Sequence, residues 1–432
     1  MFKTLPGFRE FYPEDRAKRD FIFDKWRNAA KSFGFVEFDP PVLEPLELFT
    51  EKSGEEIKSQ LFEFVDKGDR AVSLRPEMTP SLARMVGAHA KGIRKPVKWF
   101  AIGENYRYER QQKGRLRAFY QYNADILGEE SLAADAEVIA LLIESLRSFS
   151  LTENEFKLRL GDRKLWVYFL RIAGITEELD MKVLSVVDKI EKVNAQAFDE
   201  MLAEALSGTN LNVAEISEKI HSFVKTSSIE QICEIAETAS DDFKARVADW
   251  KSLLALLGNM GYADYVKPDM GIVRGLAYYT GFVFEAFQTV GTGRALAGGG
   301  RYDNLVKKLG YPDMPAVGFG MGDVTVGDLL ELTGKSGAVS DALDIYAVIG
   351  DESLRAKALP YIFGLRRRGL KVDYSFKEAS FGKQFKTADA LKAKYAVIFG
   401  GDEFANASVK IKNLTNASET LVKLADLQQF NF

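Results

Sequence analysis

The chain of 432 residues has very few of the side chains used for metal binding and nucleophilic catalysis. It contains one cysteine, Cys233, and two histidines, His89 and His221. No disulfide can therefore form within the chain, and three such side chains cannot supply the roughly four ligands of a structural zinc site. Catalysis by a Ser–His or Cys–His pair would have to use one of only two histidines. The sequence thus predicts no zinc and a chemistry carried by other side chains.

Long apolar runs are missing as well. No run approaches the ~20 residues of a membrane span, and the first residues are charged from Lys3 onward, unlike a secretory signal. A lone cysteine is typical of a reducing compartment. Together these features predict a cytoplasmic protein with no membrane association.

Charge is nearly balanced overall but uneven along the chain. The 58 Lys and Arg against 62 Asp and Glu give a net charge of −4. Residues 84–117 nevertheless carry ten basic and two acidic side chains, whereas residues 172–262 carry eight basic and sixteen acidic ones. A basic segment attracts the phosphates of nucleotides or nucleic acids, although a solvated helix face explains a charge run about equally well.

The prolines divide the chain. All twelve lie in residues 6–96 and 268–360. The proline-free gap contains amphipathic stretches of good helix formers, which predict an acidic helical insertion over residues 171–263. The expected helices there are Met181–Ala205, Asn212–Val224, Ile229–Ala236 and Phe243–Leu257.

The segments around the insertion show both helical and strand-like patterns. Residues 15–33 predict a helix and residues 35–42 a strand that Pro40 and Pro41 push to a sheet edge. Three further strands are expected at residues 97–108, 117–128 and 275–287, with a helix at residues 134–149.

The last ninety residues alternate between short strand and helix patterns. Strands are expected at residues 344–349, 371–376, 395–400 and 409–414, with helices at 352–367 and 381–394. Such alternation predicts a small α/β domain with a mostly parallel sheet. The expected organisation is a core at 1–170, the insertion at 171–263, more core at 264–333 and a separate domain at 341–432.

A candidate nucleotide site lies on the two strands of the basic segment. No phosphate-binding P-loop is present, but Arg107, Glu109 and Phe119 would share one surface of a hairpin. Arginine grips phosphate oxygens, glutamate can accept a hydrogen bond from an exocyclic amine, and phenylalanine can stack on a base. Taken singly, each residue is better explained by a surface ion pair or by core packing.

Several blocks in order resemble the histidyl-tRNA synthetase family of class II aminoacyl-tRNA synthetases. The resemblance runs nearly end to end. The blocks are LPGFREFYPED at residues 5–15, PPVLEPLELF at 40–49, SLRPEMTPSLAR at 73–84, YRYERQQKGRLRAFYQYNADILG at 106–128, VRGLAYYTGFVFEAF at 273–287, AGGGRYDNLVKKLG at 297–310 with PAVGFGMGD at 315–323, and GKQFKTADALKAKYAVIFGGDEF at 382–404.

The resemblance implies a fold, a reaction and partners. The fold would be α/β overall: a class II core with an antiparallel sheet and flanking helices, the helical insertion, and an anticodon-binding domain. The enzyme would be a ligase of protein biosynthesis that uses ATP and Mg²⁺ to activate L-histidine and then charges tRNA(His). It would be a homodimer. The chemistry needs positioning and charge neutralisation at the α-phosphate rather than a protein nucleophile, which suits the scarcity of histidine and cysteine.

The same resemblance implies roles for residues at matching positions. The catalytic cations would be Arg107 and Arg274. ATP would contact Arg107, Glu109, Arg115, Arg117, Phe119 and Arg274. Histidine would contact Glu77, Met78, Thr79, Arg107, Gln121, Asp125, Arg274, Tyr278, Tyr279 and Tyr302. The acceptor end of the tRNA would contact Arg110, Gln112 and Lys113. The sequence leaves the Mg²⁺ ligands open, with Glu285 a candidate.

Three positions depart from the family pattern. The arginine that covers the adenine in the third motif is replaced by Thr325, an aspartate of the RGL segment by Ala277, and a glutamate by the shorter Asp125. A divergent active synthetase that relies on Arg274 fits these changes. Two alternatives remain: a histidine-sensing regulatory subunit of ATP phosphoribosyltransferase, and a tRNA-binding protein with an inactive site.

Overall fold

The computed structural model describes residues 2–50, 58–109, 116–237, 239–273, 278–337 and 342–432. The chain forms two compact units, Met1–Gly337 and Ala338–Phe432. Of the helices in these described ranges, none combines the length and the apolar character that crossing a bilayer demands.

The first unit is built on an eight-stranded sheet with the order β1-β5-β6-β11-β10-β9-β7-β8. Neighbouring strands run antiparallel, except for the parallel pairs β1–β5 and β7–β8 at the two edges. The strands are β1 (Val36–Glu37), β5 (Val97–Tyr106), β6 (Ala118–Leu127), β7 (Phe156–Asp162), β8 (Val266–Pro268), β9 (Phe282–Gln288), β10 (Ala295–Arg301) and β11 (Ala316–Gly322). The antiparallel core sheet expected from the sequence is confirmed.

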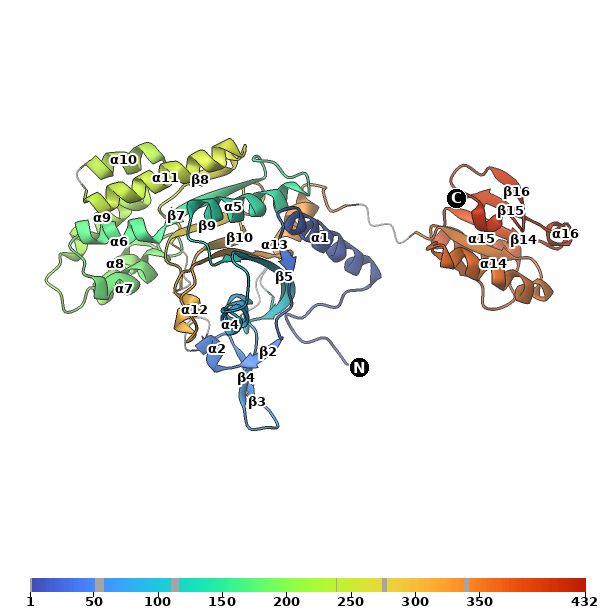
Figure 1. The fold of residues 1–432 in the computed structure, drawn as a ribbon, viewed down its shortest axis with the longest axis horizontal. Helices are drawn as coiled ribbons and strands as arrows, with labels where there is room; N and C mark the ends of the chain where they lie inside the picture. Colours follow the sequence, from blue (N-terminus) through green and yellow to red (C-terminus); the bar gives the residue numbers. More distant parts are fainter. Residues whose placement is uncertain (1, 51–57, 110–115, 238, 274–277, 338–341) are drawn as a thin grey trace. The chain divides into compact units, whose positions relative to one another are not determined.

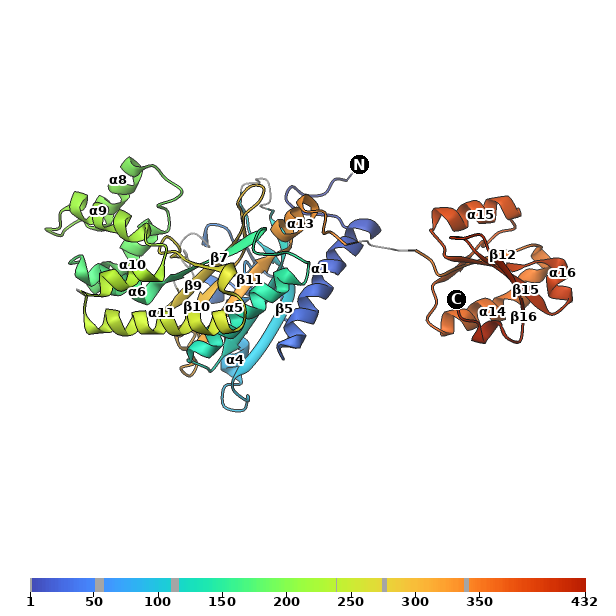
Figure 2. The ribbon, with the colours of Figure 1, turned by 90° about the horizontal axis from the view of Figure 1, so that it is seen from above.

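Helices cover one face of this sheet, as Figures 1 and 2 show for α5 and α1. The helices concerned are α1 (Pro13–Ser32), α5 (Leu132–Arg147) and α13 (Asp323–Leu332). Aromatic rings join the layers: the Trp26 ring of α1 lies 5.4 Å from Tyr122 of β6, which lies 5.3 Å from Phe319 of β11. Buried aromatic packing of this kind fixes the sheet against its helices.

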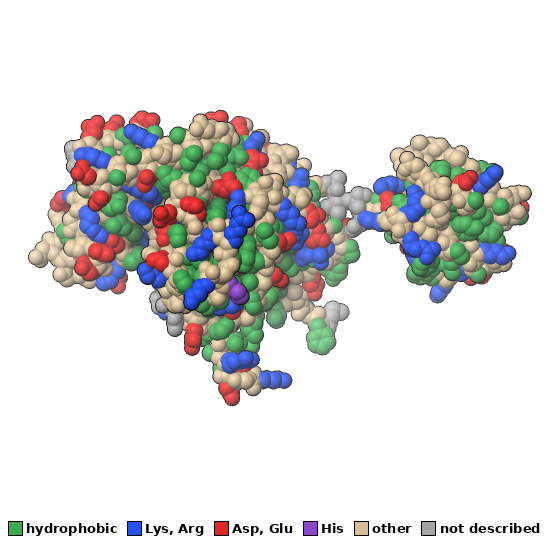
Figure 3. Space-filling view, viewed as in Figure 1, with side chains coloured by type: hydrophobic (Ala, Val, Ile, Leu, Met, Phe, Trp, Pro, Cys, Tyr) green, Lys and Arg blue, Asp and Glu red, His purple; other side chains and the backbone are tan. Residues whose placement is uncertain are grey.

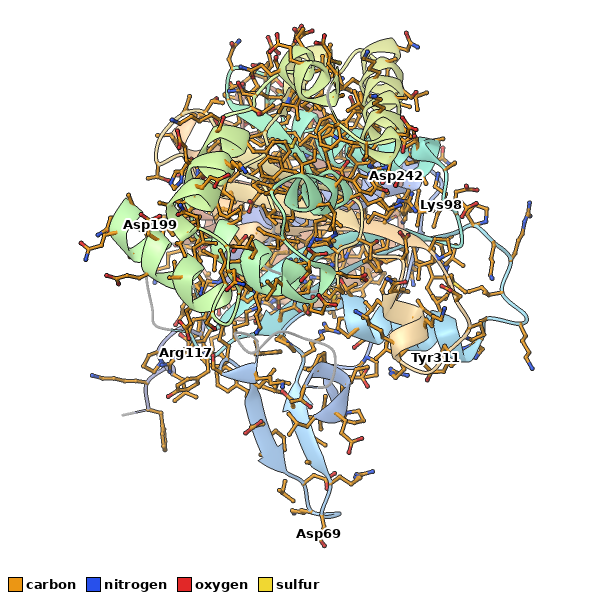
Figure 4. The ribbon with its side chains drawn as sticks, turned by 90° about the vertical axis from the view of Figure 1, so that its left-hand side faces the viewer. Asp69, Lys98, Arg117, Asp199, Asp242 and Tyr311 are labelled. Carbon is orange, nitrogen blue, oxygen red and sulfur yellow. The ribbon has the colours of Figure 1, made fainter. Side chains whose placement is uncertain are left out.

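The opposite face is covered only in part. Leu82 and Val86 of α4 (Thr79–Ala88) and Val306 of α12 (Leu305–Lys308) pack in a second apolar cluster that includes Tyr278 and Tyr302. A small sheet of β2 (Leu43–Pro45), β4 (Ala71–Leu74) and β3 (Phe62–Val65), with α2 (Glu47–Thr50), adjoins α4. Its β3–β4 turn carries Asp69 away from the body (Figure 4). Beside these elements the sheet face is hollowed, and both cavities described below lie there.

Six helices follow β7: α6 (Arg163–Ile172), α7 (Asp180–Val187), α8 (Ala195–Ala205), α9 (Val213–Val224), α10 (Ile229–Glu237) and α11 (Asp241–Asn259). The buried Asp162 carboxylate ties α11 to β7, because it accepts hydrogen bonds from Arg246 Nε (2.6 Å) and Trp250 Nε1 (2.8 Å). Acidic side chains line the outer edge formed by α10 and α11 (Figure 3). The helical stretch expected at residues 181–205 is divided into α7 and α8, since Asn194 caps α8 and starts a new helix there.

The second unit contains a five-stranded sheet with the order β13-β12-β14-β15-β16. The strands β12 (Ile345–Ile349), β13 (Val372–Tyr374) and β14 (Tyr395–Phe399) are parallel, whereas β15 (Ser408–Asn413) and β16 (Glu419–Lys423) run antiparallel. Helices α14 (Arg355–Arg367), α15 (Phe381–Ala390) and α16 (Gly401–Ala405) accompany them. The expected mostly parallel sheet is therefore corrected to a mixed one, because the last two strands form an antiparallel hairpin.

Candidate active site

Two adjoining cavities lie on the open face of the large sheet. The outer cavity has a volume of about 270 Å³ and the inner one about 120 Å³. Both are lined by Arg107 and Gln121 and by backbone of Gly298 and Gly320. A ligand in one cavity would therefore lie against the same arginine as a ligand in the other.

Glycines on β11 make room for the side chains that enter the inner cavity. A Cβ on Gly318 would lie 1.8 Å from Asp125 Oδ1, and a Cβ on Gly320 would lie 2.3 Å from Gln121 Nε2. At either position a larger residue would require the facing polar side chain to move. The glycines of the GFGMG sequence thus leave space beside β11 for two polar side chains of β6.

Tyrosine–carboxylate pairs line the inner cavity. Tyr278 donates its hydroxyl to Glu77 Oε2 at 2.9 Å, and Tyr302 donates to Asp125 Oδ1 at 2.6 Å. All four side chains are at least 95% buried. Tyr279 and Thr79 complete the wall around them. Four groups that are far apart in the sequence therefore form one compact polar pocket.

Burial determines the charge state of this pocket. It raises the pKa of Asp125 to about 7, against the lowering effect of the Tyr302 hydrogen bond and with a further rise from Glu77. Burial also raises the pKa values of Tyr278 and Tyr302, each beside a carboxylate, so both hydroxyls remain donors. Asp125 Oδ2 is buried and accepts no hydrogen bond from the described residues. It can accept one from a ligand N–H.

The amide of Gln121 is held by a neighbour on the adjacent strand. Asn105 Nδ2 donates to Gln121 Oε1 at 2.8 Å, which turns Gln121 Nε2 toward the space over Gly320. The assignment of amide oxygen and nitrogen follows from this hydrogen-bond pattern. Gln121 thus offers a donor at the boundary between the two cavities.

The outer cavity combines an aromatic ring, carboxylates and a guanidinium. Arg107 donates from Nε to Pro76 O at 3.0 Å, and its guanidinium carbon lies 5.4 Å from the centre of the Phe119 ring. Glu109 and Glu285 line the same cavity. The expectation that Arg107, Glu109 and Phe119 share one surface is confirmed.

A residue pair not foreseen from the sequence secures the end of this cavity. Asp323 begins α13 and accepts hydrogen bonds from Tyr120 N (3.0 Å) and Arg9 Nη2 (2.8 Å). Burial raises the pKa of Asp323, while Arg9 and the Tyr120 amide oppose this rise. Arg9 belongs to the block at residues 5–15, which offers no local signal for a partner more than 300 residues away. Thr325, in the first turn of α13, lies in the cavity wall.

The remaining predicted site residues lie elsewhere or outside the described residues. Met78 is fully buried at the start of α4 and does not line either cavity. The Arg117 guanidinium lies over the Tyr108 ring, 4.1 Å from its centre, and is not among the lining residues. The predicted residues outside the described ranges are Arg110, Gln112, Lys113, Arg115 and Arg274, and Ala277 is outside them too.

Comparison with known proteins now assigns the family. The family model described as histidyl-tRNA synthetase matches residues 7–324, and the model of an anticodon binding domain matches residues 345–430. The chain belongs to the histidyl-tRNA synthetase family. The antiparallel core of this histidyl-tRNA synthetase family member is the class II fold expected from the sequence.

Whole-chain relatives agree with the assignment. A histidine–tRNA ligase of Opitutus terrae is 50% identical over 427 residues, covering 99% of this chain and 97% of the relative. A chloroplastic and mitochondrial histidine–tRNA ligase of Arabidopsis thaliana is 36% identical, with coverage of 98% and 85%. The crystal structure of histidyl-tRNA synthetase from Nostoc sp. PCC 7120 is 26% identical with a TM-score of 0.79, covering 99% of this chain and 98% of that one.

Proposed function

We propose that this protein is a histidine–tRNA ligase, which activates L-histidine with ATP and transfers it to the 3′ end of tRNA(His). The observation that carries the proposal is the position of Arg107, which lines both the small polar cavity and the larger cavity beside Phe119. A reaction that joins an amino acid to a nucleotide is accelerated when a cation at the junction of the two substrates orients them and stabilises the developing charge. The whole-chain relatives named histidine–tRNA ligase support the same reaction.

In the first step, a carboxylate oxygen of histidine attacks the α-phosphorus of ATP. A new phosphorus–oxygen bond forms, the bond to the leaving pyrophosphate breaks, and histidyl-adenylate remains. Arg107 would neutralise the charge that develops on the α-phosphate and hold the carboxylate in line. Arg274, which lies outside the described residues, is proposed as the second cation because of the family resemblance.

The inner cavity would hold the histidine. Asp125 Oδ2 would accept an imidazole N–H, with Tyr302 fixing the other oxygen of the carboxylate. Glu77, Thr79 and Gln121 would bind the α-amino group, and Tyr278 and Tyr279 would close the pocket. An apolar analogue would leave buried polar groups unpaired, so this pocket suits strict selection of histidine.

The outer cavity would hold ATP. Phe119 would stack on the adenine and Glu109 would accept from its exocyclic amine, as both line that cavity. Arg115 and Arg117 are proposed for the outer phosphates. Glu285 lines this cavity, and a carboxylate is a ligand that Mg²⁺ prefers. Glu285 would therefore hold the ion, which would neutralise charge on the phosphates.

The second step transfers the histidyl group to a ribose hydroxyl of the terminal adenosine of tRNA and releases AMP. Arg110, Gln112 and Lys113 are proposed to meet the acceptor end. The second unit would bind the anticodon, as its family match suggests. A homodimer and a cytoplasmic location complete the proposal. The short edge strand β1, where Val36 is 62% exposed, is available for pairing with a second copy.

Histidine-dependent exchange between ATP and pyrophosphate tests this function directly. Purified protein should catalyse exchange with histidine and with no other amino acid, and it should charge tRNA(His). Absence of exchange at saturating ATP and Mg²⁺ would reject the ligase. Thr325 in the cavity wall favours one other candidate, the histidine-sensing regulatory subunit, which would instead co-purify with a phosphoribosyltransferase and alter its activity.

A further inference from the structure

The α13 side of the outer cavity has a threonine where related synthetases carry a cation. Thr325 lines the cavity, and the carboxylate of the preceding Asp323 is already engaged by Arg9. Among the described residues that line this cavity, Arg107 is the sole Lys or Arg, against three carboxylates. A ring bound on this side of the cavity would therefore meet no cation from α13 itself.

An arginine on the neighbouring strand reaches this same side. Arg294 directly precedes Ala295, the first residue of β10 and part of the cavity wall. Its Nη1 lies 3.8 Å from Asp328 Oδ2 on α13. Thr325 and Asp328 are three residues apart and so lie on one side of the helix, about 4.5 Å apart along its axis. The Arg294 guanidinium is therefore within about one helical turn of Thr325.

The resting position of Arg294 leaves its donors little used. Nη1 is buried and makes no hydrogen bond within the described part of the chain. The distance to Asp328 exceeds hydrogen-bond length, and the Asp328 side chain is 49% exposed, so this ion pair contributes little to stability. Because a guanidinium has five N–H groups, Arg294 can donate hydrogen bonds to a ligand.

The backbone before Arg294 is fixed, so the side chain has a firm base. Gln288 N donates to Arg294 O at 3.0 Å and closes the β9–β10 turn. Gly291 and Gly293 have φ values of 71° and 65°, which only glycine adopts readily. Gly291 also packs against Leu332 at the end of α13, where a Cβ would lie 2.6 Å from Leu332 Cδ2. The β9–β10 turn thus packs against α13, the helix that carries Thr325.

The sheet order gives Arg294 a specific partner across the cavity. Phe119 stands on β6, the glycine-rich β11 lies next to it, and β10 follows. Two strand spacings amount to about 9.5 Å, while a ring stacked on both faces needs about 7–8 Å. An adenine lying over the β11 glycines would therefore meet Phe119 on one face and a group from β10 on the other.

We propose that Arg294 supplies the cation that covers the adenine of bound ATP, in place of the arginine that the family carries at the position of Thr325. This inference rests on the ATP-dependent activation proposed above. The guanidinium leaves Asp328 and stacks on the ring face opposite Phe119, where a cation is attracted to the π system. Such an arginine holds the nucleotide and does not touch the histidine pocket.

The test is the binding of Mg·ATP and the exchange kinetics of Arg294→Ala. The KM for ATP in exchange and the Kd for Mg·ATP without histidine should each rise about tenfold, while the KM for histidine should change less than about twofold. Arg171→Ala is the control for removing an arginine away from both cavities, because Arg171 of α6 is partly exposed and also pairs with an aspartate on a neighbouring helix, Asp180. It should leave both values unchanged.

Rescue separates a ligand contact from a structural role. Arg294→Lys should retain part of the affinity for ATP, and Thr325→Arg added to Arg294→Ala should restore most of it. Unchanged ATP binding in Arg294→Ala would overturn the proposal. So would equal rises in the KM values for ATP and histidine, or a loss that neither rescue restores. Weaker Mg·ATP binding in Arg294→Ala, combined with no histidine-dependent exchange in the wild type, would reject the ligase while keeping the nucleotide contact.

Discussion

The inner and outer cavities differ in the kind of side chains that line them. In the inner cavity, Tyr278 already donates to Glu77 and Tyr302 to Asp125, and all four are buried. The outer cavity has a wall of small residues over β10 and β11, with one aromatic ring, Phe119, on its far side. The first arrangement selects a ligand by preset hydrogen bonds, whereas the second binds by stacking and charge.

This contrast has a kinetic consequence. Changes to the inner cavity should affect the use of histidine alone, and changes to the outer cavity the use of ATP alone. Arg107, which lines both, should affect the two together. Variants in each cavity can therefore test whether the inner cavity binds histidine and the outer cavity binds ATP.

The largest effect is expected for Arg107→Ala. Removing a donor at a charge-developing centre typically lowers a rate by about 10²–10³, and this residue also lines both substrate cavities. The kcat/KM of histidine-dependent exchange should therefore fall by at least about 10³ for either substrate. Steady-state exchange kinetics against the Arg171→Ala control measure this. A loss confined to one substrate would show that the cavities do not share the arginine.

Asp125→Asn should specifically impair the use of histidine. Asparagine keeps the size of the side chain and an oxygen for the Tyr302 hydroxyl, but it replaces the second acceptor with an amide donor. An imidazole N–H would then face another N–H, and such mismatches cost a large factor in selectivity. The KM for histidine should rise about 100-fold, with the KM for ATP within about twofold. Tyr302→Phe, which leaves the Asp125 carboxylate in place, should cause a smaller rise; equal changes for both substrates would contradict the separation.

Phe119→Ala should weaken the binding of ATP by a smaller factor than Asp125→Asn weakens the use of histidine. A stacked base contributes about 1–3 kcal/mol, so the Kd for Mg·ATP should rise about tenfold or somewhat more. Phe119→Tyr keeps the aromatic ring and should bind Mg·ATP with nearly the affinity of the wild type. Histidine binding measured without ATP should be unchanged in both variants. A shift in histidine affinity would mean that Phe119 shapes the inner cavity too.

Much of this arrangement was predictable from local sequence pattern. The long strands β5 and β6 were expected at residues 97–108 and 117–128, because aromatic and β-branched residues recur there between turn-forming segments. Their pairing then brings Arg107 and Phe119 to one surface. Gly318 and Gly320 belong to a segment that resembles a family motif, and the structure shows that Asp125 and Gln121 occupy the space beside them.

Contacts between distant segments were not predictable. The family resemblance places Asp125 and Tyr302 among the histidine contacts, but no sequence pattern indicates that Tyr302 donates a hydrogen bond to Asp125, which only the three-dimensional fold brings close. The Arg9–Asp323 pair likewise joins two segments that are far apart in the sequence. Strand β16 was missed because it is an edge strand with four of its five residues exposed, so it shows no apolar alternation.

A further prediction concerns the pH dependence of stability, which should distinguish the inner cavity from the outer one. Asp125 has a pKa of about 7 in the folded protein, against about 3.9 for an exposed carboxyl group. Between these values the folded state holds a proton that the unfolded state has released, so this carboxyl lowers the free energy of unfolding as the pH rises. The slope reaches about 1.4 kcal/mol per pH unit and ends above about pH 7.

Asp125→Asn removes the titrating group, so the stability of the wild type relative to this variant should decline from about pH 4 to about pH 7 and then level off. All four tryptophans lie in residues 26–250, so their fluorescence during urea unfolding reports the first unit alone. Phe119→Ala, from the outer cavity, should follow the wild type at a constant offset. Parallel curves for the wild type and Asp125→Asn would mean that Asp125 ionises as an exposed carboxylate does, and the buried polar character assigned to the inner cavity would then be wrong.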